Sequence, residues 1–184
     1  MTEEPDLDRK RLAYRQAGYA VARYAQGRKV PDLSMERSLQ SPVAAAQDKD
    51  IAGPQWPVDL GSMTRHRLEL EILAMWAGFL SESRACLGDR EPPEGWGPAR
   101  EPMAALGQRV TRNLDENDAY LEWLRRRALG LIDLPESWAA VETIAAAVLA
   151  RGAVASREAS AIVGGVNRAR RRRSGFANVF RNPR

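Results

Sequence analysis

The sequence predicts a mainly α-helical protein, a compact single domain of five or six helices with at most a small β element. Three observations predict this class. Several long segments carry apolar residues at helical spacing, residues that begin or end helices bound these segments, and Pro- and Gly-rich stretches separate them. The chain has 184 residues, which is long enough to bury a substantial core, and it shows no internal repeat and no sustained heptad pattern.

The first predicted helix spans about residues 7–26. Asp6 or Asp8 can cap its N-terminus, and Gly27 can end it in the left-handed conformation. The apolar positions of the following segment, 30–35, favour a short strand, although the proline at its second position weakens that interpretation.

A strong helix is predicted to begin at Ser62 or Thr64 and to end at Gly88. Its sequence, "RHRLELEILAMWAGFLSESRACLG", places a row of large apolar residues on one helical face. The segments on either side, 38–61 and 89–102, are rich in proline and glycine and are predicted to be irregular connections.

Three further helices are predicted at 103–110, 119–130 and 135–149, the first two joined by a bend near 113–117. The proline that opens the third of them suits a first helical turn.

A last short helix, "REASAIV", can be capped by Ser156 and stopped by Gly164 and Gly165. We therefore divide the chain into a helical body, 1–164, and a basic C-terminal tail, 165–184.

The charge is distributed unevenly along the chain. The formal net charge is +4, but the last 20 residues hold seven arginines and no acid, which leaves about −3 on the body. No run of 18 apolar residues is present, so no membrane span is expected. The N-terminus does not have the pattern of a secretory signal, and the single cysteine fits a reducing compartment, so a cytoplasmic location is expected.

The stretch "AYRQAGYAVARYAQGRKV", residues 13–30, resembles the motif helix of the FtsH-type zinc peptidase domain, which reads roughly A-Y-H-E-A-G-H-A-V and leads to a glycine before a short strand. The residues that match in register are Ala13, Tyr14, Ala17, Gly18, Ala20, Val21 and Gly27. A glycine inside a helix also suggests close packing against another element.

Two later segments carry the same resemblance. "EILAMWAGFLSES" is similar to a later helix of that family with an A-G-x-x-A-E core, through Ala77, Gly78 and Glu82. Residues 119–149 are similar to the helical hairpin that closes the domain, so the likeness covers about residues 8–163. A chance likeness of an Ala-rich helix is the alternative.

The residues that the zinc chemistry needs are absent from this motif. In the family, two histidines four residues apart bind Zn²⁺, and the glutamate beside the first accepts a proton from the bound water. Here those positions hold Arg15, Tyr19 and Gln16: a permanent cation, a poor ligand and a neutral amide. The resemblance places a third ligand at Glu101. We therefore expect no catalytic residue of this type, no bound metal and no cofactor.

Other catalytic sets have little support in the sequence. His66 and Glu69 have helical i,i+3 spacing and could share a metal, but a surface or capping histidine is the simpler interpretation. Cys86, near a helix end, fits a small apolar residue better than a nucleophile. With a single histidine, the chain has no Cys/His or Ser/His/Asp set.

The altered motif leaves two interpretations open. The former active site, formed by Arg15, Gln16 and Tyr19 with Glu82 and Glu101, could hold a peptide or a small anion, because a guanidinium binds carboxylates and phosphates through two hydrogen bonds. Alternatively, Arg15 pairs with Glu82 or another acid nearby, Glu69, and replaces the metal as a structural link.

The tail is the second candidate site, and its named residues are Arg168, Arg170, Arg171, Arg172, Arg173, Phe176 and Phe180. It could bind nucleic acid through phosphates and bases, dock on a protein, or have no specific role. The leading prediction for the whole chain is a non-catalytic protein- or peptide-binding or scaffolding module. The alternatives are an arginine-tailed nucleic-acid-binding protein and an enzyme that reuses the old cleft for chemistry without zinc.

Overall fold

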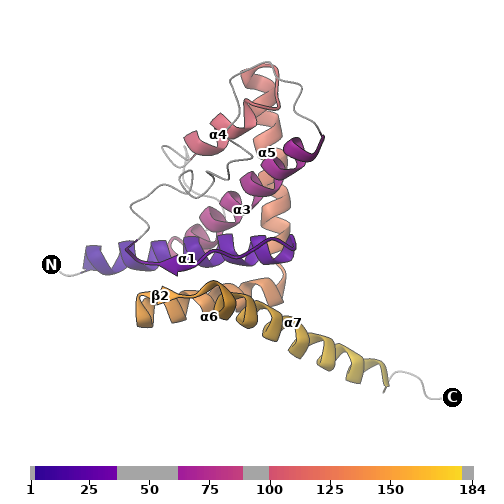
Figure 1. The fold of residues 1–184 in the computed structure, drawn as a ribbon. Coiled ribbons are helices and arrows are strands. Elements are labelled where there is room, and N and C mark those ends of the chain that lie inside the picture. The colour runs from indigo at the N-terminus through magenta and orange to yellow at the C-terminus, as the bar shows by residue number, and fades with distance from the viewer. Residues whose placement is uncertain (1–2, 37–61, 89–99, 180–184) are drawn as a thin grey trace.

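The computed structural model describes residues 3–36, 62–88 and 100–179, and within them the protein is mainly helical, as predicted (Figure 1). The helices are α1 Glu3–Ala25, α3 Ser62–Cys86, α4 Glu101–Gly107, α5 Leu114–Ile132, α6 Pro135–Arg151 and α7 Ser156–Val179. The strands β1 Leu33–Ser34 and β2 Ala153–Val154 form a small antiparallel sheet.

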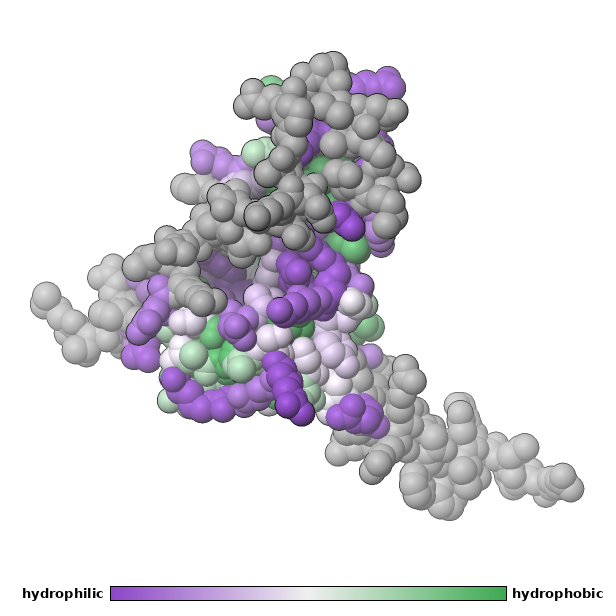
Figure 2. All heavy atoms as spheres, in the orientation of Figure 1, coloured by the Kyte–Doolittle hydropathy of each residue, from purple (hydrophilic) through white to green (hydrophobic). Residues whose placement is uncertain are grey.

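Helix α1 lies between the other long helices. Figure 1 shows α3 on one side of it and α6 on the other, and both pack directly against it. Helix α5 packs on α3, the short helix α4 packs on α3 and α5, and α7 packs mainly on α6. The visible surface of this body is mostly hydrophilic, with a small apolar area near β2 (Figure 2).

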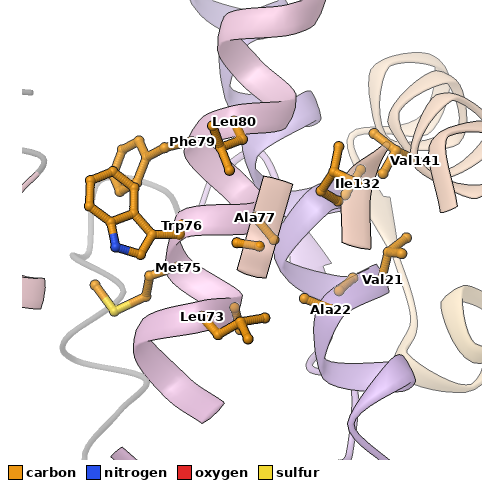
Figure 3. Close-up of a cluster of buried hydrophobic side chains, with 14 of the residues drawn as sticks. Val21, Ala22, Leu73, Met75, Trp76, Ala77, Phe79, Leu80, Ile132 and Val141 are labelled. Atoms are coloured by element: carbon orange, nitrogen blue, oxygen red, sulfur yellow. The ribbon is translucent and has the colours of Figure 1, made fainter. Parts of the chain in front are cut away.

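The core forms where four helices meet, and Figure 3 shows the cluster. Trp76 and Leu80 come from α3, Val21 from α1, Ile132 from α5 and Val141 from α6. All five side chains are buried. Because full burial of one large apolar side chain contributes about 1.5–3 kcal/mol, this cluster is a major source of stability.

The first helix begins earlier than the sequence predicted. α1 starts at Glu3, so Asp6 and Asp8 lie inside the helix and the prediction that either caps it is wrong. Pro5 is compatible with this start, since a proline in the first turn removes no helical hydrogen bond. The predicted end is confirmed by Gly27, whose φ is 69°.

Only one of the two short strands was predicted from the sequence. β1 lies in the predicted segment, and its proline precedes the strand, so that the ladder is not interrupted. Its partner β2 was not predicted: Leu33 pairs with Val154, and Ser34 with Ala153.

The middle helices follow the prediction apart from their ends. α3 begins at Ser62, and Gly88, just beyond it, has a φ of 65°. α5 begins before its predicted start because the Asn113 side chain accepts a hydrogen bond from the Glu116 backbone N–H at 2.8 Å. α6 begins at the predicted proline and ends at a left-handed glycine, Gly152.

The prediction that Gly164 and Gly165 stop the last helix is wrong, because α7 continues to Val179. Gly164 is buried, and a Cβ added to it would lie 2.8 Å from the Tyr24 hydroxyl oxygen. A Cβ at this position would require the Tyr24 side chain to shift, so glycine favours the close approach of α7 to α1. Ser156 begins the helix as predicted.

The first predicted connection, 38–61, lies outside the described residues, and so do residues 89–99 of the second connection. The last two residues of the second predicted connection belong to α4. Among the helices that are described, none combines the length and apolar character needed to cross a bilayer.

Candidate functional site

The two segments that carry the motif resemblance, one on α1 and one on α3, cross in close contact. A Cβ added to Gly18 would lie 2.3 Å from Ser81 Oγ and 2.4 Å from the Ala77 carbonyl oxygen. A Cβ added to Gly78 would lie 2.8 Å from the Arg15 carbonyl oxygen. The two backbones thus approach more closely than larger side chains would allow, and Gly18 marks close packing, as predicted.

Arg15, at the first motif position, forms an ion pair with Glu82. Its Nε donates to Glu82 Oε2 at 2.6 Å, while Arg11 Nε donates to Glu82 Oε1 at 2.8 Å. Glu82 is buried, and the Arg15 guanidinium lies 4.5 Å from the centre of the Phe79 ring. Of the two interpretations left open by the sequence, the pairing of Arg15 with an acid of α3 is confirmed.

Tyr19, at the second ligand position, donates a hydrogen bond to a different carboxylate, Glu71. Glu71 is only 1% exposed, forms an ion pair with Arg28 at 2.8 Å, and also accepts a hydrogen bond from Arg23 at 3.2 Å. Arg23 donates in addition to the Tyr19 hydroxyl at 2.8 Å. Burial first, and then the negative charge of Glu71, raises the pKa of Tyr19 far above its ordinary value, so the phenol stays protonated.

Gln16, at the position of the general base, binds the backbone of β1. Its Nε2 donates to the Ser34 carbonyl at 2.8 Å, and its Oε1 accepts from the Ser34 N–H at 3.0 Å. In an antiparallel pair, alternate residues point their N–H and C=O groups away from the partner strand. Gln16 therefore covers the outer edge of β1 at Ser34, where an added strand would bind.

The three motif positions do not converge on one ligand. Arg15 reaches Glu82 and Tyr19 reaches Glu71, and these carboxylates are 11 residues apart on α3, about 16 Å along the helix axis. Glu101, the expected third ligand, is exposed at the start of α4. Within the described ranges, no cluster of three or more His, Cys, Asp or Glu side chains has a geometry that could hold a metal.

The other candidate residues have ordinary surroundings. His66 is largely exposed, and its Nδ1 lies 3.8 Å from Glu69 Oε2, as expected for a surface histidine. Cys86 is partly buried, and that burial raises the pKa of its thiol, which disfavours the thiolate needed for nucleophilic attack.

Sequence reasoning did not find the groups that complete these two ion-pair clusters, namely Arg11, Arg23, Arg28 and Glu71. A signal for them was present. Arg11 precedes Arg15 by one helical turn, Arg23 follows Tyr19 by one turn, and Glu71 and Glu82 are three turns apart and so share a face of α3.

An exposed aromatic surface on α5 was not predicted from the sequence. Trp123 is 47% exposed, its ring stacks on Tyr120 with centroids 6.0 Å apart, and the Arg127 guanidinium lies 4.8 Å from its ring centre. Gly130 follows one turn later and is also exposed. We call Tyr120, Trp123, Arg127 and Gly130 the Trp123 face.

The predicted tail is largely part of α7 in the structure, which extends to Val179 and crosses the predicted boundary at 164/165. Arg168 is exposed, and Arg170–Arg173 and Phe176 belong to the same helix. Phe180 lies outside the described residues.

Comparison of the chain with models of protein families, with curated proteins and with solved structures gives no match.

Proposed function

We propose that the chain is a non-catalytic relative of the FtsH-type peptidase domain and acts as a protein-binding module through the Trp123 face of α5. The observation that carries the binding role is the exposed indole of Trp123 with the Arg127 guanidinium stacked on it. Trp and Arg are among the residues most enriched at the energetic centres of protein interfaces.

The absence of zinc peptidase activity follows from the occupied motif positions. A cationic guanidinium, a neutral amide and a protonated phenol stand where two metal ligands and a base are required. Each is already bonded to the protein itself, at Glu82, Ser34 and Glu71 respectively. The same bonds argue against a peptide pocket at this site, because a ligand would have to displace them.

The relationship to the peptidase family is supported by the contact between the two resembling segments. Gly18 and Gly78 were matched separately in sequence, and each lies at the point where its helix meets the other. A fold inherited without its reaction explains why the small packing residues remain while the ligands differ.

The chemistry of the Trp123 face defines its partner. Glu122, beside Trp123, is held by Arg125 and Arg126 at 2.7–2.9 Å, whereas the Arg127 guanidinium lies over the indole. An apolar side chain that covers the indole, next to a carboxylate that reaches Arg127, complements this face. We therefore propose a protein segment with an acidic residue beside a large apolar one.

The test uses purified full-length chain in affinity capture from its source cells, followed by calorimetry with each purified partner. Trp123→Ala is expected to lower the affinity for a partner that binds this face by about 30-fold, since truncation of an interface hot spot costs about 2 kcal/mol. Leu114→Ala is the matched control, because Leu114 is also exposed on α5 but about 180° round the helix from Trp123. Equal affinity of both variants for every purified partner would refute the proposed face.

A further inference from the structure

The C-terminal half of α7 is a basic helix held out from the body. The first half is anchored: Ala159 and Val163 are buried, Ser156 Oγ donates to the Val30 carbonyl at 2.5 Å, and the Ser156 N–H donates to Asp32 at 2.8 Å. Figure 1 shows the second half continuing away from the other helices. The backbone of α7 thus leads its distal part away from the body.

The charge of that distal half is not balanced within the helix. The last acid of the chain is Glu158, which binds Arg151 at 2.6 Å. Beyond it, five arginines fall within the six residues 168–173, and no carboxylate lies one turn before or after any of them. Apart from the small ions of the solvent, only groups outside α7 can therefore neutralise this segment.

The arginines are distributed round the whole helix rather than along one face. With about 100° per residue, positions 168, 170, 171, 172 and 173 lie at about 0°, 200°, 300°, 40° and 140° round the axis. A flat acidic protein surface meets only one side of a helix, and charged residues are depleted at the centres of protein interfaces. The distribution therefore fits a partner with negative charge on two opposite sides.

The major groove of B-form DNA has this arrangement. It is about 12 Å wide, admits an α-helix, and is lined by phosphates on both walls. The segment 168–173 rises about 7.5 Å along its axis, and duplex DNA carries about four to five phosphates over that length. The deep, narrow major groove of duplex RNA does not admit a helix in this way.

We infer that residues 168–173 of α7 bind the phosphate backbone of double-stranded DNA, with the helix lying in the major groove and without sequence preference. This inference is independent of the proposed protein-binding face, because the two surfaces share no residue. The body supplies the anchored first half of α7, and the arginines supply the contact.

Fluorescence anisotropy of the full-length chain with a labelled duplex of about 20 base pairs tests the inference. Five phosphate contacts predict a slope of log K against log salt of about −4.5, so affinity falls roughly 500-fold between about 50 and about 200 mM salt. The variant R170Q/R171Q/R172Q/R173Q is expected to lose most of the binding and to lower the slope to about −1.

Two matched variants distinguish binding by this segment from binding by positive charge elsewhere on the protein. R9Q/R65Q/R112Q/R157Q removes four exposed arginines of the body and is expected to bind within about threefold of wild type. R170K/R171K/R172K/R173K keeps the charge and is expected to bind nearly as tightly as wild type, because a point charge is sufficient for phosphate.

Three results would overturn the inference. The first is no binding, or a salt slope shallower than about −2, for the wild-type chain. The second is equal weakening by the body variant. The third is binding of single-stranded DNA, duplex RNA or polyglutamate as tightly as duplex DNA. Such a result would show that the major groove of DNA is not what the helix recognises.

Discussion

Arg15 Nε lies 2.6 Å from Glu82 Oε2, and this ion pair joins α1 to α3 at the position where the motif resemblance places a zinc ligand. Glu82 is buried, and it also accepts a hydrogen bond from Arg11, so both of its oxygens are bonded to α1. A charge-assisted link between two helices thus lies at this position.

Gly18→Ala is expected to destabilise the fold by about 2 kcal/mol or more. The new methyl group would collide with Ser81 and with the Ala77 backbone, which outweighs the gain in helix propensity of about 1 kcal/mol. Gly130→Ala is the control, because Gly130 is helical and has open space around it, so it is expected to be neutral or stabilising. Urea denaturation measures both, and an equal effect of the two changes would contradict the close crossing.

Glu71→Gln is expected to cost about 3 kcal/mol. The change removes the negative charge that faces Arg23 and Arg28 in a buried site and leaves two guanidinium groups without a counter-charge. Glu122→Gln also removes a carboxylate held by two arginines, but Glu122 is much more exposed, so its cost is expected to stay below about 1 kcal/mol. Similar costs for the two variants would show that burial of Glu71 is not important.

Tyr19 gives the fold a dependence on alkaline pH. Its pKa in the folded state is raised above the ordinary value of 10.0 by burial and by Glu71, so the unfolded chain loses the phenolic proton first. The stabilisation is complete below pH 10 and decreases as the pH rises above it. The free-energy difference between wild type and Tyr19→Phe, measured by denaturation from pH 8 to 11, is therefore expected to narrow above pH 10.

The alternative outcome for Tyr19 is equally specific. If Tyr19 were not held by this hydrogen bond, absorbance at the tyrosinate band would show it titrating near pH 10 in the folded wild-type protein. The difference in unfolding free energy between wild type and Tyr19→Phe would then not change with pH. Either result would contradict the buried hydrogen bond to Glu71.

Gln16→Ala is expected to lower stability by about 1 kcal/mol, because the change removes both hydrogen bonds to Ser34 and exposes the outer edge of β1. Gln16→Glu keeps the acceptor for the Ser34 N–H but places a negative charge against the Ser34 carbonyl, so it is expected to be no better. Hydrogen exchange at the Ser34 amide measures the loss directly. Unchanged protection in both variants would contradict the role given to Gln16.

The helical spacing of apolar residues predicted most of the helices, whereas the position of each helix end depends on a single residue. Gly27 and Gly152 end helices in the left-handed conformation, as a helix-ending glycine commonly does. Gly164 has the same residue type but serves close packing on Tyr24, so reading it as a stop was wrong. A glycine that provides space and a glycine that provides a turn cannot be distinguished without knowing which element lies opposite.

Long-range pairing accounts for the remaining differences. β2 contains two residues, Ala153 and Val154, and its pairing with β1 across more than one hundred residues leaves no local signal. The pairing of Arg15 with Glu82 was one of the predicted alternatives, because Arg15 lies in the stretch that carries the motif resemblance. Glu71 was missed because it is not one of the positions matched to the family in the stretch that it begins, and only the packing of α3 on α1 brings it to Tyr19.

A double-mutant cycle on Arg15 and Glu82 tests most directly the claim that this ion pair joins α1 to α3. The free energy of unfolding of wild type, Arg15→Ala, Glu82→Ala and the double variant gives the coupling between the two side chains, and the contact of Arg15 with Phe79 cancels in the cycle. The structure predicts a coupling of about 1.5 kcal/mol or more, as for a charged hydrogen bond to a buried group. Additive effects, with a coupling below about 0.3 kcal/mol, would contradict it.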